Sequence, residues 1–488
     1  MPDPISFDTS RTAPKGTEVL GVPVHTSGPV PRSLGLNRAS LEALGFEAKV
    51  GQAVALPARN GALIVAVGLG DAGAVTTSSL RTAAAALARA AAKRSWLATS
   101  LVDVEGVDAR DAAQAVAEGI VLASYRYTAL KAEATPSKLQ RVTLLGADAG
   151  KAQAGAARGL AAARATCLAR DLANTPPDRL SARDLAVRAE ELGRASGLAV
   201  EVFDEEAIAE MRLGGLLGVN RGSVEPPRLV KLTYEPRNPK GTVALVGKGV
   251  MYDSGGISLK PSDPMHAAMK MDMTGAAVVL AVMTALAALK PRVKVVGYLA
   301  CTDNMPSGSA LKLGDVLTIR NGKTVEIHNT DAEGRLLLAD ALTLAVEDGA
   351  DAIVDIATLT GACLAALGTK IAGVMGNDDA WVAQLESAAK RSDEQVWRLP
   401  LPAEYRKLLD SDVADMKNVG GPYAGALTAG LFLQEFVSGK PWAHLDIAGP
   451  MRSEADEGWL TKGATAFGVR LLLELLDKAD VALPAPAS

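Results

Sequence analysis

The octapeptide Asn329–Leu336, N-T-D-A-E-G-R-L, carries three charged residues at alternate positions: Asp331, Glu333 and Arg335. A strongly apolar stretch follows it as far as Val346. Burying a charge costs free energy unless the charge is paired or bound to a metal. In an extended backbone, residues two apart face the same way, so we expect the three side chains to project together. Converging carboxylates repel each other, and divalent cations remove that penalty.

A second window of candidate residues lies upstream of the octapeptide. It starts in the glycine-rich segment Gly247–Gly256 and contains Lys248, Asp253, Lys260 and Asp272. Singly, these residues have ordinary interpretations, such as a surface lysine or a helix cap. Together, acids from distant segments suit a two-metal centre with the ions about 3.5–4 Å apart. The chain has 4 histidines and no H-E-x-x-H motif, which argues against a single-zinc protease of that type.

These residues need a scaffold, and the apolar pattern predicts one. A buried strand at Val243–Val246 leads directly into Lys248 and Asp253, and sites in parallel sheets form at the carboxyl ends of strands. Alternating elements predict βαβ units, with further strands at 62–67, 142–145, 293–300 and 352–356 and helices at 77–93, 152–173, 276–289 and 336–347.

The predicted fold class is α/β with two domains. Residues 1–150 would form a smaller N-terminal α/β domain, and residues 151–173 a connecting helix that ends before Pro176-Pro177. Residues 174–488 would form a larger catalytic α/β/α domain with a mixed, largely parallel sheet.

The joint pattern resembles the leucine aminopeptidase family, the cytosolic two-metal exopeptidases. The octapeptide looks like that family's signature, matched in full. Other matches follow in the family's order: Asn174–Pro177, Gly247–Gly256, Ser258–Pro261, Asp272, Ala357–Gly361 and Trp442–Gly449. The resemblance covers essentially all of residues 170–470 and is weak over the first 150.

The resemblance implies a ligand set. One metal would be held by Lys248, Asp253, Asp272 and Glu333. The other would be held by Asp253, Glu333 and both the side chain and the backbone carbonyl of Asp331. A lysine ligand must be neutral, and burial beside a dication would supply the necessary fall in its pKa. Between Lys260 and Asp272 the chain has one residue more than the usual family spacing, which makes Asp263 a second candidate for the position of Asp272.

The resemblance also implies catalytic roles and a substrate. Lys260 would stabilise the oxyanion, and Arg335 would anchor a bicarbonate that acts as general base. The substrate would be a peptide with a free N-terminus, because its α-amine ligates a metal. An apolar pocket favouring Leu would be lined by Met269, Thr358, Gly361, Ala448 and Met451. The metal ions would be Mn²⁺, Zn²⁺ or Mg²⁺, among which oxygen ligands and one amine select weakly, and the assembly would be a homohexamer.

Three other functions compete with this interpretation. The pairs Ser309–Lys312 (S-x-x-K) and Ser258–Lys260 (S-x-K) could serve a serine acyl-enzyme hydrolase, but the accompanying S-D-N and K-T-G motifs are missing. Gly68–Gly73 spells G-x-G-x-x-G, yet position 93, where a ribose-binding acid is expected, is lysine. An accessory DNA-binding role would need a basic patch within residues 1–150.

Composition argues against several partners. The chain has 51 basic and 55 acidic residues and a net charge of −4, which gives no support for a nucleic-acid partner. Its 3 cysteines (167, 301 and 363) are far apart and fit a reducing compartment. The start of the sequence has no apolar signal region. The apolar run Gly275–Leu289 is shorter than the roughly 20 residues of a membrane span, so we expect a buried helix and a cytoplasmic protein.

Overall fold

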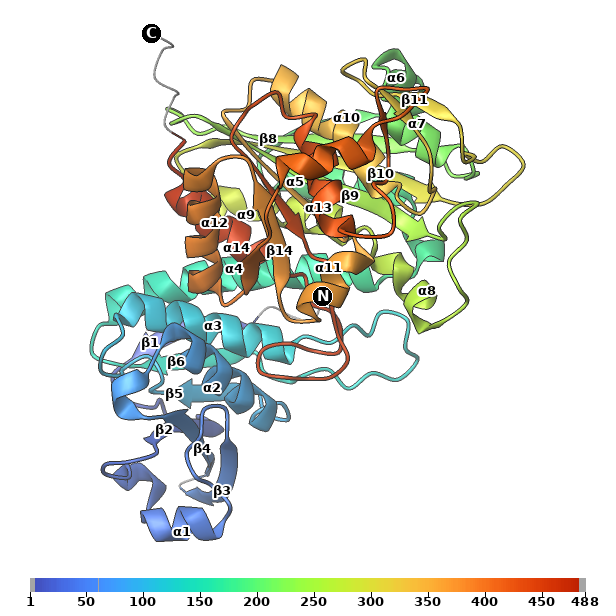
Figure 1. Ribbon diagram of the computed structural model, residues 1–488. Helices are drawn as coiled ribbons and strands as arrows, with labels where there is room; N and C mark the ends of the chain where they lie inside the picture. The colour runs from blue at the N-terminus through green and yellow to red at the C-terminus, as the bar shows by residue number, and fades with distance from the viewer. Residues whose placement is uncertain (1–4, 60, 482–488) are drawn as a thin grey trace. The chain divides into compact units, whose positions relative to one another are not determined.

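The computed structural model describes residues 5–59 and 61–481, which form two compact units (Figure 1). Unit 1 comprises Met1–Cys167 and Ser453–Gly463, and unit 2 comprises Leu168–Arg452 and Ala464–Ser488. The chain passes from unit 1 to unit 2 within the long helix α4 (Ala149–Asn174). The segment Ser453–Gly463 is anchored in unit 1, where Arg89 donates to the carbonyl of Leu460 over 2.8 Å.

Unit 1 is built on a mainly parallel sheet with the strand order β1-β6-β5-β2-β4-β3, in which β3 is antiparallel to β4. Its described strands are β1 (Ser6–Ser10), β2 (Val19–His25), β3 (Ala53–Arg59), β4 (Ala62–Gly70), β5 (Trp96–Thr99) and β6 (Arg141–Leu145). Its helices are α1 (Arg38–Ala43), α2 (Thr77–Ala90) and α3 (Ala109–Ser124).

Helices α2 and α3 pack closely because both are rich in alanine. A Cβ on Gly119 of α3 would lie 2.2 Å from the carbonyl oxygen of Arg81 on α2, so this contact requires glycine. The same contact buries an ion pair, with Arg81 Nε 2.7 Å from Glu118 Oε2 and both side chains 2% exposed.

Unit 2 contains a larger sheet with the strand order β15-β14-β17-β13-β9-β10-β8-β7. The neighbours β17, β13, β9 and β10 run parallel, whereas β14, β8 and β7 each pair antiparallel with a neighbour. The bounds are β7 (Ala199–Phe203), β8 (Arg228–Tyr234), β9 (Thr242–Asp253), β10 (Lys294–Asn304), β13 (Ala352–Ala357), β14 (Ala372–Gly376), β15 (Val396–Arg398) and β17 (Trp442–Asp446). Short ladders are formed by β11 (Val316–Thr318), β12 (Thr324–Glu326) and β16 (Met416–Lys417), and by β18 (Arg452–Ser453) with β19 (Gly463–Ala464).

Helices cover the sheet of unit 2 (Figure 1). They are α5 (Ala182–Ala195), α6 (Glu205–Glu210), α7 (Gly214–Asn220), α8 (Pro264–Ala268), α9 (Thr274–Leu289), α10 (Gly334–Glu347), α11 (Gly361–Leu367), α12 (Asp379–Ser392), α13 (Gly425–Gln434) and α14 (Val469–Lys478). Ala244 and Val246 of β9 share a core cluster with Leu336–Leu338 of α10. Because strand residues alternate between faces, this cluster defines the α10 face of the sheet.

Helix α9 is apolar on nearly every side. Among the described residues, the stretch Pro264–Leu289 is long and apolar enough to cross a membrane, but 78% of its most apolar window is buried inside the fold. It therefore has the position of a core helix, which agrees with the predicted buried helix. Gly275 lets α9 approach the sheet, since a Cβ there would lie 2.1 Å from the carbonyl oxygen of Ile356.

The predicted strands and helices are all present, but β4, β9 and β10 end several residues later than expected. β4 continues past Val67 to Gly70, β9 past Val246 to Asp253 and β10 past Ala300 to Asn304. The apolar pattern stops at Lys248 and Thr302, where buried polar residues replace aliphatic ones. A prediction based on apolar residues alone therefore makes a strand too short when its carboxyl end carries polar site residues.

Candidate metal centre

Strand β9 supplies two of the candidate residues. Lys248 lies in the middle of the strand and Asp253 is its last residue, and each is 2% exposed. The chain then turns at Gly255, whose φ angle is +89°. A Cβ on Gly255 would lie 2.4 Å from the Ser258 carbonyl oxygen and 2.9 Å from Asp331 Oδ1. Glycine is needed here for both reasons, the backbone angle and the close approach.

The octapeptide is a turn followed by a helix, not an extended segment. Helix α10 begins at Gly334, and Glu333 just before it already has helical angles, φ −79° and ψ −38°. The expectation that Asp331, Glu333 and Arg335 project together from an extended backbone is therefore wrong, because residues two apart do not face each other on a helix. Gly334 lies against Lys248, and a Cβ there would be 2.5 Å from Lys248 Cε.

Lys248 joins two carboxylates from different segments. Its Nζ lies 2.7 Å from Asp272 Oδ2 and 2.7 Å from Glu333 Oε1. It also donates to the backbone carbonyl of Thr358 over 3.1 Å. Asp272 follows the 3₁₀ turn Met269–Met271 and is 4% exposed. The one-residue difference in spacing therefore does not take Asp272 out of the cluster.

Lys260 joins the other two carboxylates. Its Nζ lies 2.8 Å from Asp253 Oδ2 and 2.5 Å from Asp331 Oδ1. Its side chain is 20% exposed and that of Asp331 is 32% exposed, so this half of the cluster reaches solvent while the Lys248 half does not. Asp263 instead caps α8, accepting from the backbone N–H of His266 over 2.9 Å.

Burial and crowding shift the pKa values of these groups. Desolvation disfavours the charged form of Lys248, but the carboxylates of Asp272, Glu333 and Asp253 outweigh it and raise its pKa. The pKa of Glu333 is raised by burial and by its acidic neighbours Asp253 and Asp331. Without a cation, the four acids thus hold both lysines as ammonium ions and still repel one another.

Arg335 lies buried in the first turn of α10. Its Nη1 donates to the backbone carbonyl of Asn418 over 2.7 Å. Its Nε is buried and has no hydrogen-bond partner among the described residues. Desolvation lowers its pKa to about 10, although Glu333 and Asp446 favour the charged form. A buried guanidinium with an unused donor suits an anion.

Two domain models of one protein family match the chain. The catalytic domain of the cytosol aminopeptidase family matches residues 167–473, and the N-terminal domain of the same family matches residues 33–134. The chain belongs to the cytosol aminopeptidase family.

Relatives of known sequence and structure agree. A probable cytosol aminopeptidase of Streptomyces coelicolor is 45% identical over 469 residues, covering 90% of each chain, and one of Alkaliphilus metalliredigens is 45% identical over 422 residues, covering 84% of each. A solved structure described as the bottromycin maturation enzyme BotP in complex with Mn aligns with a TM-score of 0.88 at 43% identity, covering 95% of this chain and 99% of that one. The chain therefore has the α/β fold of this family. Its activity is that of the family, a metal-dependent aminopeptidase that acts on peptides.

The residues present fit the divalent ions of the cytosol aminopeptidase family. Asp253, Asp331 and Glu333 each offer one carboxylate oxygen, and these oxygens lie within 4.8 Å of one another. Oxygen ligands suit hard divalent cations. Ions bound here would relieve the repulsion among the acids, which the two lysines only partly offset.

The predicted pocket residues lie on several segments of unit 2. Thr358 is joined directly to the cluster, because its hydroxyl donates to Asp272 Oδ1 over 2.7 Å. Met269 is half-buried at the start of the 3₁₀ turn before Asp272, and Gly361 is exposed at the start of α11. Ala448 is half-buried after β17, and Met451 is buried. That these residues line one pocket stays a prediction.

Two buried asparagines at the site were missed from the sequence. Asn304 donates to Asp253 Oδ1 over 2.8 Å. Asn418 is fully buried and donates to the backbone carbonyl of Asn329 over 2.6 Å. Asn304 could have been predicted as a site residue, because it lies at the carboxyl end of a parallel strand. No feature of the neighbouring sequence identifies Asn418.

The serine alternatives find no support in the geometry. Lys260 is held by two carboxylates and Ser258 Oγ accepts from the backbone N–H of Thr330 over 3.2 Å. Ser309 Oγ donates to the Arg221 carbonyl over 2.7 Å, while Lys312 pairs with Asp315. In neither pair is the lysine placed as a free base for the serine.

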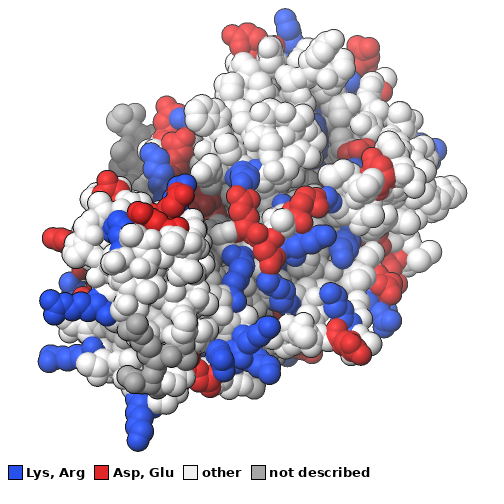
Figure 2. All heavy atoms as spheres, turned by 90° about the horizontal axis from the view of Figure 1, so that it is seen from below, with Lys and Arg blue, Asp and Glu red and all other residues white. Residues whose placement is uncertain are grey.

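The glycine motif of unit 1 also lacks its expected context. The strand β4 ends at Gly70, a 3₁₀ turn occupies Ala72–Ala74, and α2 begins only at Thr77. The glycines therefore do not open a helix onto a phosphate. On the face drawn in Figure 2, basic and acidic side chains are interspersed, which gives no support to a nucleic-acid surface there.

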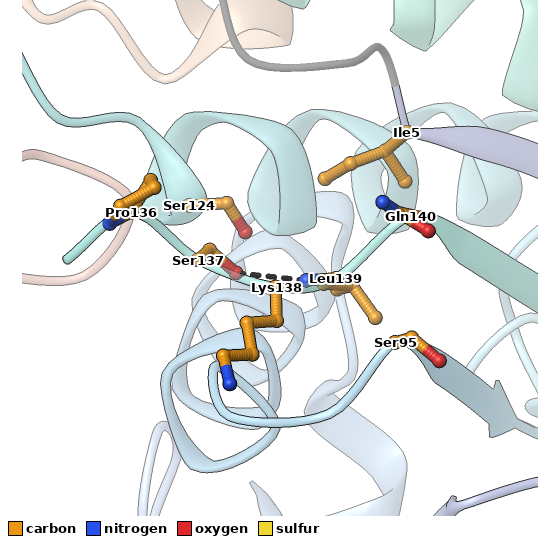
Figure 3. Close-up of a pocket in the computed structure, with 8 residues that line it drawn as sticks. All are labelled: Ile5, Ser95, Ser124, Pro136, Ser137, Lys138, Leu139 and Gln140. Atoms are coloured by element: carbon orange, nitrogen blue, oxygen red, sulfur yellow. Dashed lines mark hydrogen bonds between the residues drawn. The ribbon is translucent and has the colours of Figure 1, made fainter.

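A cavity of about 420 Å³ in unit 1 is a poor candidate for the chemistry. Figure 3 shows its mixed lining, in which the apolar Ile5, Pro136 and Leu139 accompany Ser95, Ser124, Ser137, Lys138 and Gln140. None of its described lining residues is a carboxylate or a histidine. The groups with strongly shifted pKa values that mark active sites instead cluster in unit 2.

Proposed function

We propose that the chain is a leucyl-type aminopeptidase that releases N-terminal Leu and other apolar residues from peptides during intracellular peptide turnover. The observation that carries this proposal is the convergence of Asp253, Asp331 and Glu333 with two lysines at the carboxyl end of a parallel strand. An apolar first pocket built from Met269, Thr358, Gly361, Ala448 and Met451 would favour Leu.

We assign the ligands as follows. Lys248, Asp253, Asp272 and Glu333 would hold one ion, and Asp253, Glu333 and the side chain and carbonyl of Asp331 would hold the other. Asp253 and Glu333 would thus serve both ions. The contacts of Lys248 with Asp272 and Glu333, both at 2.7 Å, support this grouping. Lys248 must lose its proton to act as a ligand, and bound dications would favour the neutral amine.

Bound ions would supply an ionised water and a Lewis acid for the scissile carbonyl. Lys260 provides a fixed positive charge for the developing oxyanion, and its partial exposure leaves it open to a substrate. Arg335 would hold a bicarbonate that could act as general base, a role supported by its buried, unused Nε. The free α-amine of the substrate binds beside these groups, so a blocked N-terminus is excluded.

Several finer properties belong to the same proposal. The ions are Mn²⁺ or Zn²⁺, with Mg²⁺ as a third candidate, and the Mn complex of a relative 43% identical favours testing Mn²⁺ first. The protein acts in the cytoplasm, which the names of the cytosol aminopeptidase relatives support. Its active form is a homohexamer, as the resemblance to the leucine aminopeptidase family implies. The domain limits are residues 1–150 and 174–488, joined by 151–173.

The test is hydrolysis of leucine p-nitroanilide by chelator-stripped protein that is resupplied with Mn²⁺, Zn²⁺ or Mg²⁺ in turn. We expect no release without metal and release with at least one ion. Activity that persists after chelation would support a serine enzyme instead, and inactivity with every ion would refute the proposal.

Two matched substrates sharpen this experiment. Acetyl-leucine p-nitroanilide keeps the apolar side chain but blocks the amine, so it should not be cleaved. Lysine p-nitroanilide keeps the amine but changes the side chain, and a kcat/KM equal to that for leucine would contradict the apolar pocket while leaving the metal mechanism intact.

A further inference from the structure

Asn304 stands at the point where β10 meets the end of β9. It is the register partner of Asp253, and the ladder between the two strands shifts between Thr302 and Asn304. The shift brings the Asn304 side chain to the cluster, where it is 4% exposed. A bulge that re-aims a side chain is common beside active sites.

The Asn304 amide uses both of its donor hydrogens at the cluster. Nδ2 lies 2.8 Å from Asp253 Oδ1 and 3.0 Å from the backbone carbonyl oxygen of Thr330. It thereby connects a proposed shared ligand with the octapeptide that carries Asp331 and Glu333. No hydroxyl could replace it, because a hydroxyl has a single hydrogen to donate.

Because of the hydrogen bond from Asn304, the two carboxylate oxygens of Asp253 have different partners. Oδ1 accepts from Asn304 and from the backbone N–H of Gly255, at 2.8 and 2.9 Å. Oδ2 is the oxygen that faces Lys260, at 2.8 Å. With Oδ1 occupied by two protein donors, Oδ2 is the oxygen left for Lys260 or for a bound ion.

The second bond fixes the loops around Asp253. Thr330 is 1% exposed, and its hydroxyl donates to the Gly255 carbonyl over 2.7 Å. The same hydroxyl accepts from the backbone N–H of Ser258 over 2.8 Å. Thr330, whose carbonyl accepts from Asn304, therefore ties the octapeptide to the chain segment that runs on to Lys260.

We propose that Asn304 is a positioning residue for the metal centre, holding Asp253 and the octapeptide in the arrangement that accepts the ions. This inference rests on the proposed function. Groups that orient metal ligands typically contribute about 10–100-fold to metal affinity. Asn304 would act through Asp253 and would touch neither substrate nor metal itself.

The test is calorimetric titration of the chelator-stripped full-length protein with Mn²⁺ alone. For Asn304→Ala we expect the Kd for Mn²⁺ to rise about 10–100-fold. Asn304→Leu keeps the branched shape and the heavy-atom count of asparagine but not its hydrogen bonds, and it replaces the alanine variant if that variant does not fold; it should show the same rise. Unchanged affinity in a folded variant would overturn the proposal.

Asn220 offers a matched control. It is 7% exposed and its Nδ2 also donates twice, to the Glu225 carbonyl over 2.9 Å and to Thr302 Oγ1 over 3.1 Å, but not to an acid of the cluster. Asn220→Ala should lower the melting temperature as much as Asn304→Ala does while keeping the Kd for Mn²⁺ within about twofold. An equal loss of affinity in both variants would reduce the role of Asn304 to general stability.

The same titration separates the two proposals. If the unsubstituted protein binds no Mn²⁺, Zn²⁺ or Mg²⁺, the proposed function fails. If it binds Mn²⁺ and the Asn304 variants bind equally well, only the role of Asn304 fails.

Discussion

Both units bury charge beneath helices on a mainly parallel sheet, but the two sets of charges differ. In unit 1, Arg81 and Glu118 form one pair with one charge of each sign. In unit 2, two lysines contact four carboxylates: Asp253, Asp272, Asp331 and Glu333. A balanced pair can satisfy itself, whereas an excess of buried carboxylates needs further positive charge. The candidate metal centre therefore differs from the buried pair of unit 1 in its excess of negative charge and not in being buried.

The largest loss of turnover should follow from neutralising one of the four carboxylates of the metal centre. Glu333→Gln keeps the shape of the side chain but removes the charge shared by the proposed ions. Turnover of leucine p-nitroanilide at saturating Mn²⁺ should fall by more than about 100-fold, since even groups that only orient ligands contribute 10–100-fold. The fold should survive, as checked by circular dichroism. Wild-type turnover in this variant would refute the shared-ligand role.

Lys260→Met tests whether the two lysines differ in function. Removing the charge proposed to stabilise the oxyanion should lower kcat by about 10²–10³-fold. Mn²⁺ should bind at least as tightly as before, because an ammonium group that contacts Asp253 and Asp331 is gone. Lys312→Met is the control, since Lys312 is 56% exposed and should leave kcat unchanged. Loss of activity in the control variant alone would support a serine acyl-enzyme hydrolase that uses Lys312.

Glu118→Gln makes the same chemical change in the balanced pair of unit 1. It removes the carboxylate charge that lies 2.7 Å from the buried Arg81 guanidinium, so the free energy of unfolding in urea should fall by about 3 kcal/mol. Turnover per folded molecule should be unchanged. A large fall in turnover with unchanged stability would contradict the assignment of a structural role to the pair in unit 1 and a catalytic role to the cluster in unit 2.

The smallest effect concerns the hydroxyl that contacts Asp272. Thr358→Val removes one hydrogen bond of 2.7 Å, worth about 1 kcal/mol or roughly fivefold in Mn²⁺ affinity. Thr358→Ser, which keeps the hydroxyl, should retain the affinity. If the valine variant instead changes the preference for leucine over lysine p-nitroanilide at constant Mn²⁺ affinity, Thr358 acts as a pocket residue only.

Local patterns were sufficient for much of the scaffold. Alternating apolar runs predicted β9, α9, β10, α10 and β13 with errors mainly at their polar ends. The octapeptide was misjudged because alternate charges suggest an extended backbone, whereas Gly334 begins a helix. Asn304 was missed because the predicted strand stopped at Ala300, before the polar residues that close β10.

The sequence by itself determined which residue types are available and the two windows in which they occur, because residue chemistry and apolar periodicity are local properties. The tertiary structure decided which charges meet: Lys248 with Asp272 and Glu333, and Lys260 with Asp253 and Asp331. It also decided that Arg335 is held by Asn418, 83 residues further along the chain. Such pairings depend on strand order and on close approaches at Gly255 and Gly334, which only the packed sheet and helices define.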